Sequence, residues 1–479
     1  MKMFSTALLF LLPLVLNAQW VQWYATYDNP TNGTGHETAS VAVIGPNSFV
    51  ALVSTPNTRC FLILYVNADS ATGRRFSYGY GSAQTAGKFL QWINPTNSAD
   101  TVSLRNAWNI AAKDSLIYVA NNDADHNILV FRVQSDTIVS TQYRVKTGPN
   151  PIWGVAVDSA GYVYVSNDTS NSVSDDVKIY PPVAQWAATH DNQPVRTVNL
   201  PDGGYRGIAV NPSGSMLFVS DYGNRRVLKY TGTTVSGYSA STSFSFQLSP
   251  SDTLSGPAGP ISPGPLGMSY LSPNNILFVA VDAFLAASAA YSYGKIYVLN
   301  PYTGEPASTT DTLVNVINVA KWNFDHTGAY DRRTNGTTPG NASGYASTYD
   351  VKVDSEKNLY SQSYYGYTVE KWSYTGNLPS LSPPTSVRVE VPLAFELSQN
   401  YPNPFNPSTV IAYSLPNRSV AVLTVFNLLG QVVRTLVHEE QGPGRYEVRF
   451  DARDLPSGLY FYQLQAGTTT QTKRMVLLK

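Results

Sequence analysis

The sequence predicts an all-β protein, in which a six-bladed β-propeller precedes a small immunoglobulin-like β-sandwich. Three observations support this prediction: a strand-rich unit that recurs six times, a Pro/Ser-rich break after it, and a composition with 32 tyrosines, 34 glycines and 31 prolines in 479 residues. Tyrosine suits pleated strands, whereas glycine and proline suit the turns between short strands. Helical periodicity of useful length is absent from the sequence.

The repeated unit has an alternating apolar strand, a turn, a second apolar strand, a polar turn and a third strand, and the residues between units can supply a fourth. Asp158–Gly161 and Asn211–Gly214 place Asx first and glycine last, as type I turns favour. Radial stacking covers both apolar faces of such a unit. The six units are Ala39–Tyr65, Trp108–Val133, Trp153–Tyr180, Arg206–Tyr230, Leu266–Leu299 and Tyr349–Tyr374.

Two of these units resemble a known repeat. Residues 153–166 and 206–230, with Asp221–Leu228 as their most recognisable part, look like NHL repeats. The resemblance implies an NHL-like propeller. Seven blades are the alternative to six, because the interval between Leu299 and Tyr349 is long enough to hold an irregular blade. The strand-like segment Trp20–Tyr27 is expected to close the ring beside the last unit.

The chain begins like an exported protein. A positively charged start, a short apolar run and a small residue at Ala18 predict a signal peptide over residues 1–18. No later run is long and apolar enough to cross a membrane, so we expect no transmembrane segment in the mature chain. The expected organisation is then a propeller over 19–378, a Pro/Ser-rich linker over 379–392 and the sandwich over 393–479.

The last ninety or so residues read as about seven short strands, which is typical of a small sandwich. The boxes in residues 395–407, 425–433, 455–460 and 473–479 resemble, in order, the C-terminal sorting domain (type A) of the type IX secretion system. An ordinary adhesive module is the alternative. The residues that carry the resemblance are Asn400, Tyr401, Pro402, Asn403, Pro404, Phe405, Gly430, Gly458, Tyr460 and Lys473.

The resemblance implies secretion to the surface or exterior of a Gram-negative, Bacteroidota-like bacterium by way of its periplasm. The implied partners are the secretion machinery, a sortase-like peptidase that removes the domain, and cell-surface lipopolysaccharide as an attachment point. The formal net charge of zero and the 13% of charged residues argue against nucleic acid as a partner.

Catalytic motifs do not stand out. The five histidines are scattered, no two have metal-ligand spacing, and the single Cys60 sits in a strand-like run typical of a buried apolar residue. We therefore expect no cofactor and assign no metal-ligating residues. A bound divalent metal stays an open alternative. His36 and Glu37 near the first inner strand, and His326 in the long polar insertion 323–347, keep a metal-assisted lyase or hydrolase as an alternative.

Propeller geometry suggests one binding site. The first strand of each blade lines the central channel, so the residue before each such strand should lie near one mouth. Trp108, Trp153, Arg206 and Tyr349 are the candidate ligand-binding residues there, with Ala39 and Leu266 completing the ring. Three aromatic rings and one cation suit a glycan, a peptide or a small aromatic or anionic ligand, unless the side chains plug the channel. The sequence thus favours a binding module over a structural adhesin.

Overall fold

The computed structural model describes residues 18–27, 38–55, 59–67, 74–78, 88–93, 99–122, 126–167, 175–186, 192–249, 254–256, 259–283, 294–319, 321–322, 348–364, 368–383, 395–416, 419–441 and 444–479. The chain divides into two compact units, residues 1–382 and residues 383–479. The predicted signal peptide and the polar insertion 323–347 lie outside the described residues, apart from Ala18.

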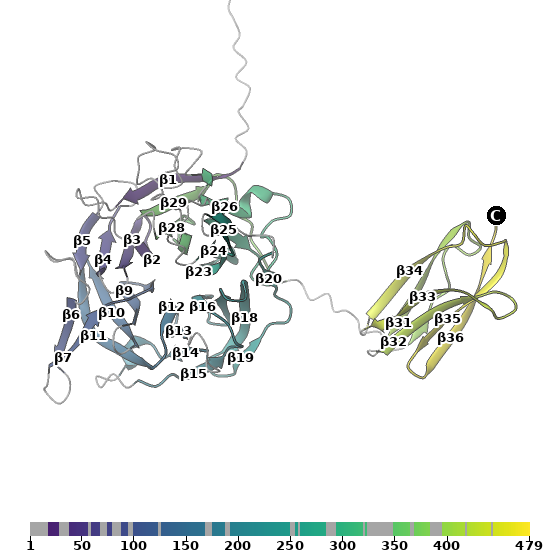
Figure 1. Cartoon of the computed structure of the whole chain (residues 1–479), viewed down its shortest axis with the longest axis horizontal. Coiled ribbons are helices and arrows are strands. Elements are labelled where there is room, and N and C mark those ends of the chain that lie inside the picture. Colours follow the sequence, from purple (N-terminus) through teal and green to yellow (C-terminus); the bar gives the residue numbers. More distant parts are fainter. Residues whose placement is uncertain are drawn as a thin grey trace, which may run out of the picture. The chain divides into compact units, whose positions relative to one another are not determined.

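The first unit is a propeller whose blades are antiparallel sheets arranged around a common centre (Figure 1). Blade 1 comprises β2 (Thr38–Gly45), β3 (Ser48–Thr55), β4 (Arg59–Tyr65) and β5 (Arg74–Tyr78). Blade 2 comprises β8 (Asn109–Lys113), β9 (Leu116–Asn122), β10 (His126–Gln134) and β11 (Thr137–Gly148). Blade 3 comprises β12 (Ile152–Val157), β13 (Val163–Asn167), β14 (Asp176–Tyr180) and β15 (Arg196–Asn199).

The remaining blades follow the same order from the channel outward. Blade 4 comprises β16 (Tyr205–Val210), β17 (Met216–Asp221), β18 (Arg226–Thr233) and β19 (Gly237–Ala240), with β20 (Phe246–Gln247) also paired to β18. Blade 5 comprises β23 (Gly264–Leu271), β24 (Ile276–Asp282), β25 (Lys295–Leu299) and β26 (Val316–Asn318). Blade 6 comprises β27 (Thr348–Val353), β28 (Leu359–Ser363), β29 (Thr368–Tyr374) and β1 (Trp20–Tyr27). Two small ribbons, β6–β7 (Lys88–Ile93 with Ala99–Leu104) and β21–β22 (Leu254–Gly256 with Gly259–Ile261), accompany the blades.

The N-terminal strand closes the ring, as the sequence predicts. β1 pairs antiparallel with β29 and so supplies the outer strand of the blade whose other strands come from residues 348–374. Trp20 is buried there, and its Nε1 donates a hydrogen bond to the Val314 carbonyl at 3.0 Å. Each of the six predicted units forms one blade, and the described residues hold six such sheets, not seven.

The turn chemistry of the repeat is also confirmed. Gly161 and Gly214 have positive φ angles of 90° and 70°, and each donates its N–H to the Asx carbonyl three residues earlier. The Asp158 carboxylate additionally accepts from the Tyr162 amide and the Tyr164 hydroxyl. This bond ties the turn to the strand that follows it.

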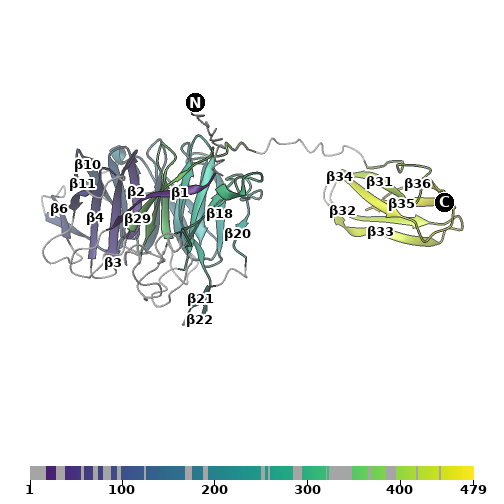
Figure 2. The same cartoon turned by 90° about the horizontal axis from the view of Figure 1, so that it is seen from above.

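The second unit is a two-sheet sandwich (Figure 2), as predicted. Tyr462, Phe450 and Leu423 are fully buried between the sheets, while alternate residues along the strands are more exposed. One sheet has β30 (Glu396–Leu397), β31 (Ser408–Leu415) and β34 (Gly444–Asp451). The other has β33 (Val432–Gln441), β32 (Ser419–Phe426), β35 (Gly458–Ala466) and β36 (Thr469–Leu477).

Candidate ligand-binding site in the propeller

The structure gathers the predicted mouth residues at one end of the channel. All six line a single small cavity, together with residues that follow them on the inner strands. The remaining space is about 30 Å³, close to the volume of one water molecule. At its centre this mouth is therefore filled by side chains and leaves no room for a ligand such as a sugar. The six residues are Ala39, Trp108, Trp153, Arg206, Leu266 and Tyr349.

Stacked side chains close the mouth. The Tyr349 and Tyr364 rings stack with centroids 5.0 Å apart, and Tyr364 in turn stacks on Trp108 at 6.1 Å. Trp108 contacts Trp153 at 5.3 Å, and the Arg206 guanidinium lies 4.2 Å from the centre of the Trp153 ring. Offset ring pairs and a cation over indole are both attractive, so the row stabilises itself without a ligand.

Arg206 also borders an open depression beside the closed mouth. This second cavity measures about 390 Å³ and is lined by polar side chains and by glycine backbone. A Cβ added to Gly204 would lie 3.1 Å from the Gly223 nitrogen, and one added to Gly223 would lie 3.1 Å from the Gly204 nitrogen, so the two backbone segments pass close to each other beside the depression. Its lining residues are Asp202, Gly203, Gly204, Arg206, Tyr222, Gly223 and Asn224.

A buried carboxylate spans the channel just below the mouth. Asp350 on β27 is fully buried, and its Oδ2 accepts hydrogen bonds from Ser40 Oγ at 2.5 Å and from Asn109 Nδ2 at 3.2 Å. Its Oδ1 accepts from the Val351 amide at 2.9 Å and from Lys352 Nζ at 2.6 Å. The side-chain Oδ1 of Asn109 accepts a hydrogen bond from the Val155 amide, so the network around this carboxylate connects blades 6, 1, 2 and 3.

Glycine occupies the equivalent position in the other three blades. A Cβ on Gly207 would lie 2.0 Å from the Leu266 carbonyl oxygen, and one on Gly267 would lie 2.1 Å from Asp350 Oδ1. A Cβ on Gly154 would lie 2.9 Å from the Arg206 carbonyl oxygen. These positions therefore require glycine, because the neighbouring inner strand fills the space of any side chain.

The sequence reasoning missed this polar layer. Its signal was visible, since the residue that follows each mouth residue is glycine in three units and Ser40, Asn109 or Asp350 in the others. Tyr364 and Tyr222 were missed as well, because neither occupies a mouth position in the repeat. Only the tertiary structure places Tyr364 between Trp108 and Tyr349.

Another buried carboxyl group lies where β24 meets the next blade. Asp282 accepts hydrogen bonds from the amides of Ala283 at 2.6 Å and Thr348 at 2.8 Å. Burial raises the pKa of Asp282 to about 8, and those two amides only partly offset the effect. Its counterpart Asp221 in blade 4 instead pairs with Arg226 at 2.9 Å. Asp282 thus holds the backbone at Thr348, the first residue of β27, which is a structural role.

Metal and nucleophile chemistry gains no support from the part of the chain that the structure describes. No group of three or more His, Cys, Asp or Glu side chains converges there in a way that could hold a metal ion. His36, Glu37 and His326, on which the metal-assisted alternative depends, lie outside the described residues. Cys60 is buried, and burial raises the pKa of its thiol to about 11, so it is unsuited to nucleophilic attack.

The predicted sorting-signal residues fall into buried anchors and exposed turns. Asn400 is buried and its Nδ2 donates to the Pro402 carbonyl at 3.1 Å, while its amide donates to the Tyr462 hydroxyl at 2.8 Å. Phe405 is buried beside Phe450, and its amide and carbonyl pair with the C-terminal strand.

Other residues of the sorting boxes shape the edges of the sandwich. Gly430 has a φ of 76° in the turn between β32 and β33, and Gly458 opens β35. The Tyr460 hydroxyl donates to the Pro456 carbonyl at 2.8 Å, and Lys473 pairs with Tyr462 across β35 and β36. Asn403 accepts from the Val476 amide, whereas Tyr401 is 81% exposed. Pro402 and Pro404 lie in the same loop, before Phe405.

Comparison with known protein families identifies the C-terminal part of the chain. Residues 399–478 match the secretion system C-terminal sorting domain. The protein is therefore exported by the type IX route to the cell surface or extracellular space of a Bacteroidota-type bacterium. The search of curated proteins returned no match. Among the residues that the structure describes, no helix is long and apolar enough to span a membrane.

Solved structures resemble the chain only distantly. The β-propeller domain of Cps50 (Swd1) from Myceliophteria thermophila shares 9% identity, with a TM-score of 0.39 over 73% of this chain and 100% of that one. A Bacteroides thetaiotaomicron protein of unknown function shares 12% identity, with a TM-score of 0.42 over 75% and 76%. A Lactobacillus plantarum protein shares 10% identity, with a TM-score of 0.37 over 90% and 99%.

Proposed function

We propose that this exported propeller, which carries a type IX sorting domain, is a binding module for an extracellular carbohydrate. The observation that carries the proposal is the open depression of about 390 Å³ beside the closed aromatic mouth. Sugars are bound through hydrogen bonds to polar side chains and main-chain groups, combined with contact to aromatic faces. Asp202, Asn224 and the glycine backbone offer the first, and Tyr222 offers the second.

Arg206 links the depression to the stacked row. Its guanidinium rests on Trp153 and its Nη1 donates to the Tyr205 carbonyl at 2.9 Å, so the side chain is held in place before a ligand arrives. A preorganised cation loses little conformational freedom on binding, which favours affinity. Trp108, Trp153 and Tyr349 accordingly act as the support of the site, and Arg206 acts as its contact with ligand.

The test is a binding screen on the full-length protein. We expect a saturable rise in the thermal midpoint with one class of oligosaccharide, and at least a tenfold weaker affinity in Arg206→Ala. Arg132→Ala is the matched control, because Arg132 is exposed on β10 away from the depression. Binding that survives Arg206→Ala, or binding of peptides alone, would contradict the carbohydrate proposal. Metal-dependent breakdown of a bound ligand would favour the lyase or hydrolase alternative, and no binding at all would favour a structural adhesin.

The export steps are proposed from the family resemblance. Residues 1–18 act as the signal peptide, and the sandwich is recognised by the secretion machinery and removed by its sortase-like peptidase. The propeller, whose repeats we take as NHL-like, is then released or attached to lipopolysaccharide. Mass spectrometry of the mature product tests this: a C-terminus in the stretch before residue 395 is expected, and an intact Lys479 would contradict removal.

A further inference from the structure

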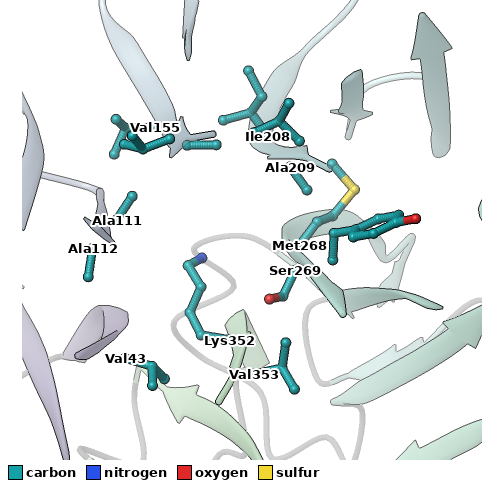
Figure 3. A pocket seen from close by; sticks show the side chains of 14 residues that line it. Val43, Ala111, Ala112, Val155, Ile208, Ala209, Met268, Ser269, Lys352 and Val353 are labelled. Atoms are coloured by element: carbon teal, nitrogen blue, oxygen red, sulfur yellow. The ribbon is translucent and has the colours of Figure 1, made fainter. Parts of the chain in front are cut away.

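The two units differ in how far they satisfy their own side chains. Beyond the aromatic mouth, the propeller channel widens into a cavity of about 190 Å³ between the inner strands of all six blades (Figure 3). Lys352 faces this cavity, and its ammonium is paired at 2.6 Å with the carboxylate of Asp350. The charge there is therefore balanced within β27. In the sandwich, by contrast, a group of apolar side chains remains exposed to water.

One end of the outer face of the sandwich's four-stranded sheet is apolar. Leu459 and Phe461 on β35 alternate with buried core residues, so their half-buried side chains lie on the outer face. The strand register places Phe426 of β32 beside Phe461, and Val432 of β33 beside Phe426. It also places Val476 of β36 beside Leu459. An apolar row thus crosses all four strands at this end.

The turn between β32 and β33 extends the row into solvent. Leu428 is 67% exposed and Leu429 is 81% exposed. The Asn427 Oδ1 fixes the turn, because it accepts hydrogen bonds from the amides of Leu429 and Gln431, both at 3.0 Å. Leu478, which directly follows β36, is exposed as well. We call this surface the apolar tip, and it comprises Phe426, Leu428, Leu429, Val432, Leu459, Phe461, Val476 and Leu478.

Polar side chains border the apolar tip on the same face. Two positions further along the strands, Thr424, Gln463 and Thr472 lie side by side in the register. Arg474, which is exposed, lies beside Phe461. An exposed apolar patch with a polar border is typical of a surface that binds another protein. The border also defines the chemistry of a complementary partner, which is an apolar groove with a carboxylate opposite Arg474.

The apolar tip gathers residues from three of the four boxes that carry the resemblance to the sorting domain. Its members fall in the boxes at 425–433, 455–460 and 473–479, apart from Phe461 one position beyond the second. All of them lie within the matched residues 399–478. A buried box residue such as Phe405 is explained by packing in the core. Packing does not explain a patch of apolar box residues in water, so these residues indicate a partner that covers them.

We propose, building on the recognition of the sandwich proposed above, that the apolar tip docks on a protein of the type IX secretion machinery. Leu428 and Leu429 enter an apolar groove of that protein, and the row behind them packs against its walls. Docking removes this apolar surface from water, which favours the complex. The export route favours this occupant over a second copy of the chain, because the machinery must bind the domain that carries the family's boxes.

Export of the full-length protein from a Bacteroidota-type host with a type IX system tests the docking surface. Leu428→Ser combined with Leu429→Ser removes the apolar anchor, while Asn427 keeps the turn. We expect the amount of protein outside the cell to fall about tenfold and the protein to accumulate in the periplasm. Val420→Ser is the matched control, because Val420 is exposed on the same face of β32 at its other end, and this variant should be exported like the wild type. Normal export of the double variant would overturn the proposal.

A further variant keeps the test valid should the double variant fail to fold. Leu478→Ser changes another part of the apolar tip, just after β36, and should lower export about threefold. Thermal midpoints of the purified proteins that equal the wild-type value show that the variants fold. Export of a folded Leu478→Ser at the wild-type level would contradict the proposal.

A host without a working type IX system separates the docking surface from the export route itself. Wild-type protein that reaches the exterior of that host equally well would contradict recognition by the machinery. Export that needs the machinery but tolerates both tip variants would contradict the apolar tip alone. Wild-type protein that sediments as a dimer, and as a monomer after the two leucine substitutions, would assign the tip to a second copy of the chain and overturn the proposal.

Discussion

Blades 3, 4 and 5 differ from blades 6, 1 and 2 at one layer of the channel. The first group has glycine at the second mouth-side position, and the second group has Asp350, Ser40 and Asn109. In the glycine half the neighbouring inner strands approach until backbone meets backbone. In the polar half the strands are joined by side-chain hydrogen bonds to one carboxylate. The comparison teaches that the repeat keeps its fold when half of its copies carry a polar residue in place of glycine, grouped around one shared carboxylate.

The largest expected effect comes from breaking the glycine half. Gly267→Ala places a Cβ 2.1 Å from Asp350 Oδ1 and 2.6 Å from its Cα, so backbone must move. We expect a loss of about 4 kcal/mol in the free energy of unfolding. Urea unfolding followed by tryptophan fluorescence measures it, since all eight tryptophans precede residue 383 and report on the propeller. Gly45→Ala, which meets nothing within 4 Å, is the control, and equal losses in the two variants would contradict the packing argument.

The next effect comes from Asp282 in blade 5, which among the described residues has no cationic partner such as the Arg226 that pairs with Asp221 in blade 4. With a folded pKa of about 8, Asp282 stays protonated in the folded state, whereas in the unfolded state it ionises near its ordinary pKa of 3.8. The folded state then binds more protons, so stability falls as pH rises from about 4 to about 8. Between pH 5 and pH 7 the contribution is about 3 kcal/mol.

Asp282→Asn removes this titration. Between pH 5 and pH 7, the free energy of unfolding of the variant should therefore fall by about 3 kcal/mol less than that of the wild type. Urea unfolding of both proteins at pH 5 and pH 7 checks the difference. Parallel pH dependences in the two proteins would show that Asp282 is ionised in the folded state.

The smallest of the three effects is expected from a substitution in the polar half, which comprises blades 6, 1 and 2. Lys352→Met leaves Asp350 with its Ser40, Asn109 and backbone donors but without a cation. We expect a loss of about 2 kcal/mol, below the roughly 3–5 kcal/mol of a wholly enclosed pair, because the amine reaches the cavity. Adding Asp350→Asn should recover part of the loss, measured in the same urea unfolding. A double variant less stable than Lys352→Met would show that the carboxylate is stabilised by the hydrogen bonds alone.

The sequence by itself determined the repeats, their turns, the closing strand and the sorting domain. These depend on local alternation and on turn residues such as Gly161 and Gly214, which act within a few positions of one another. Tertiary structure alone decided the chemistry of the channel. Ser40 and Asp350 are 310 positions apart, and Tyr364 enters the aromatic row from the end of a second strand. Contacts across the ring depend on how six sheets rotate about one axis, and no local pattern records that geometry.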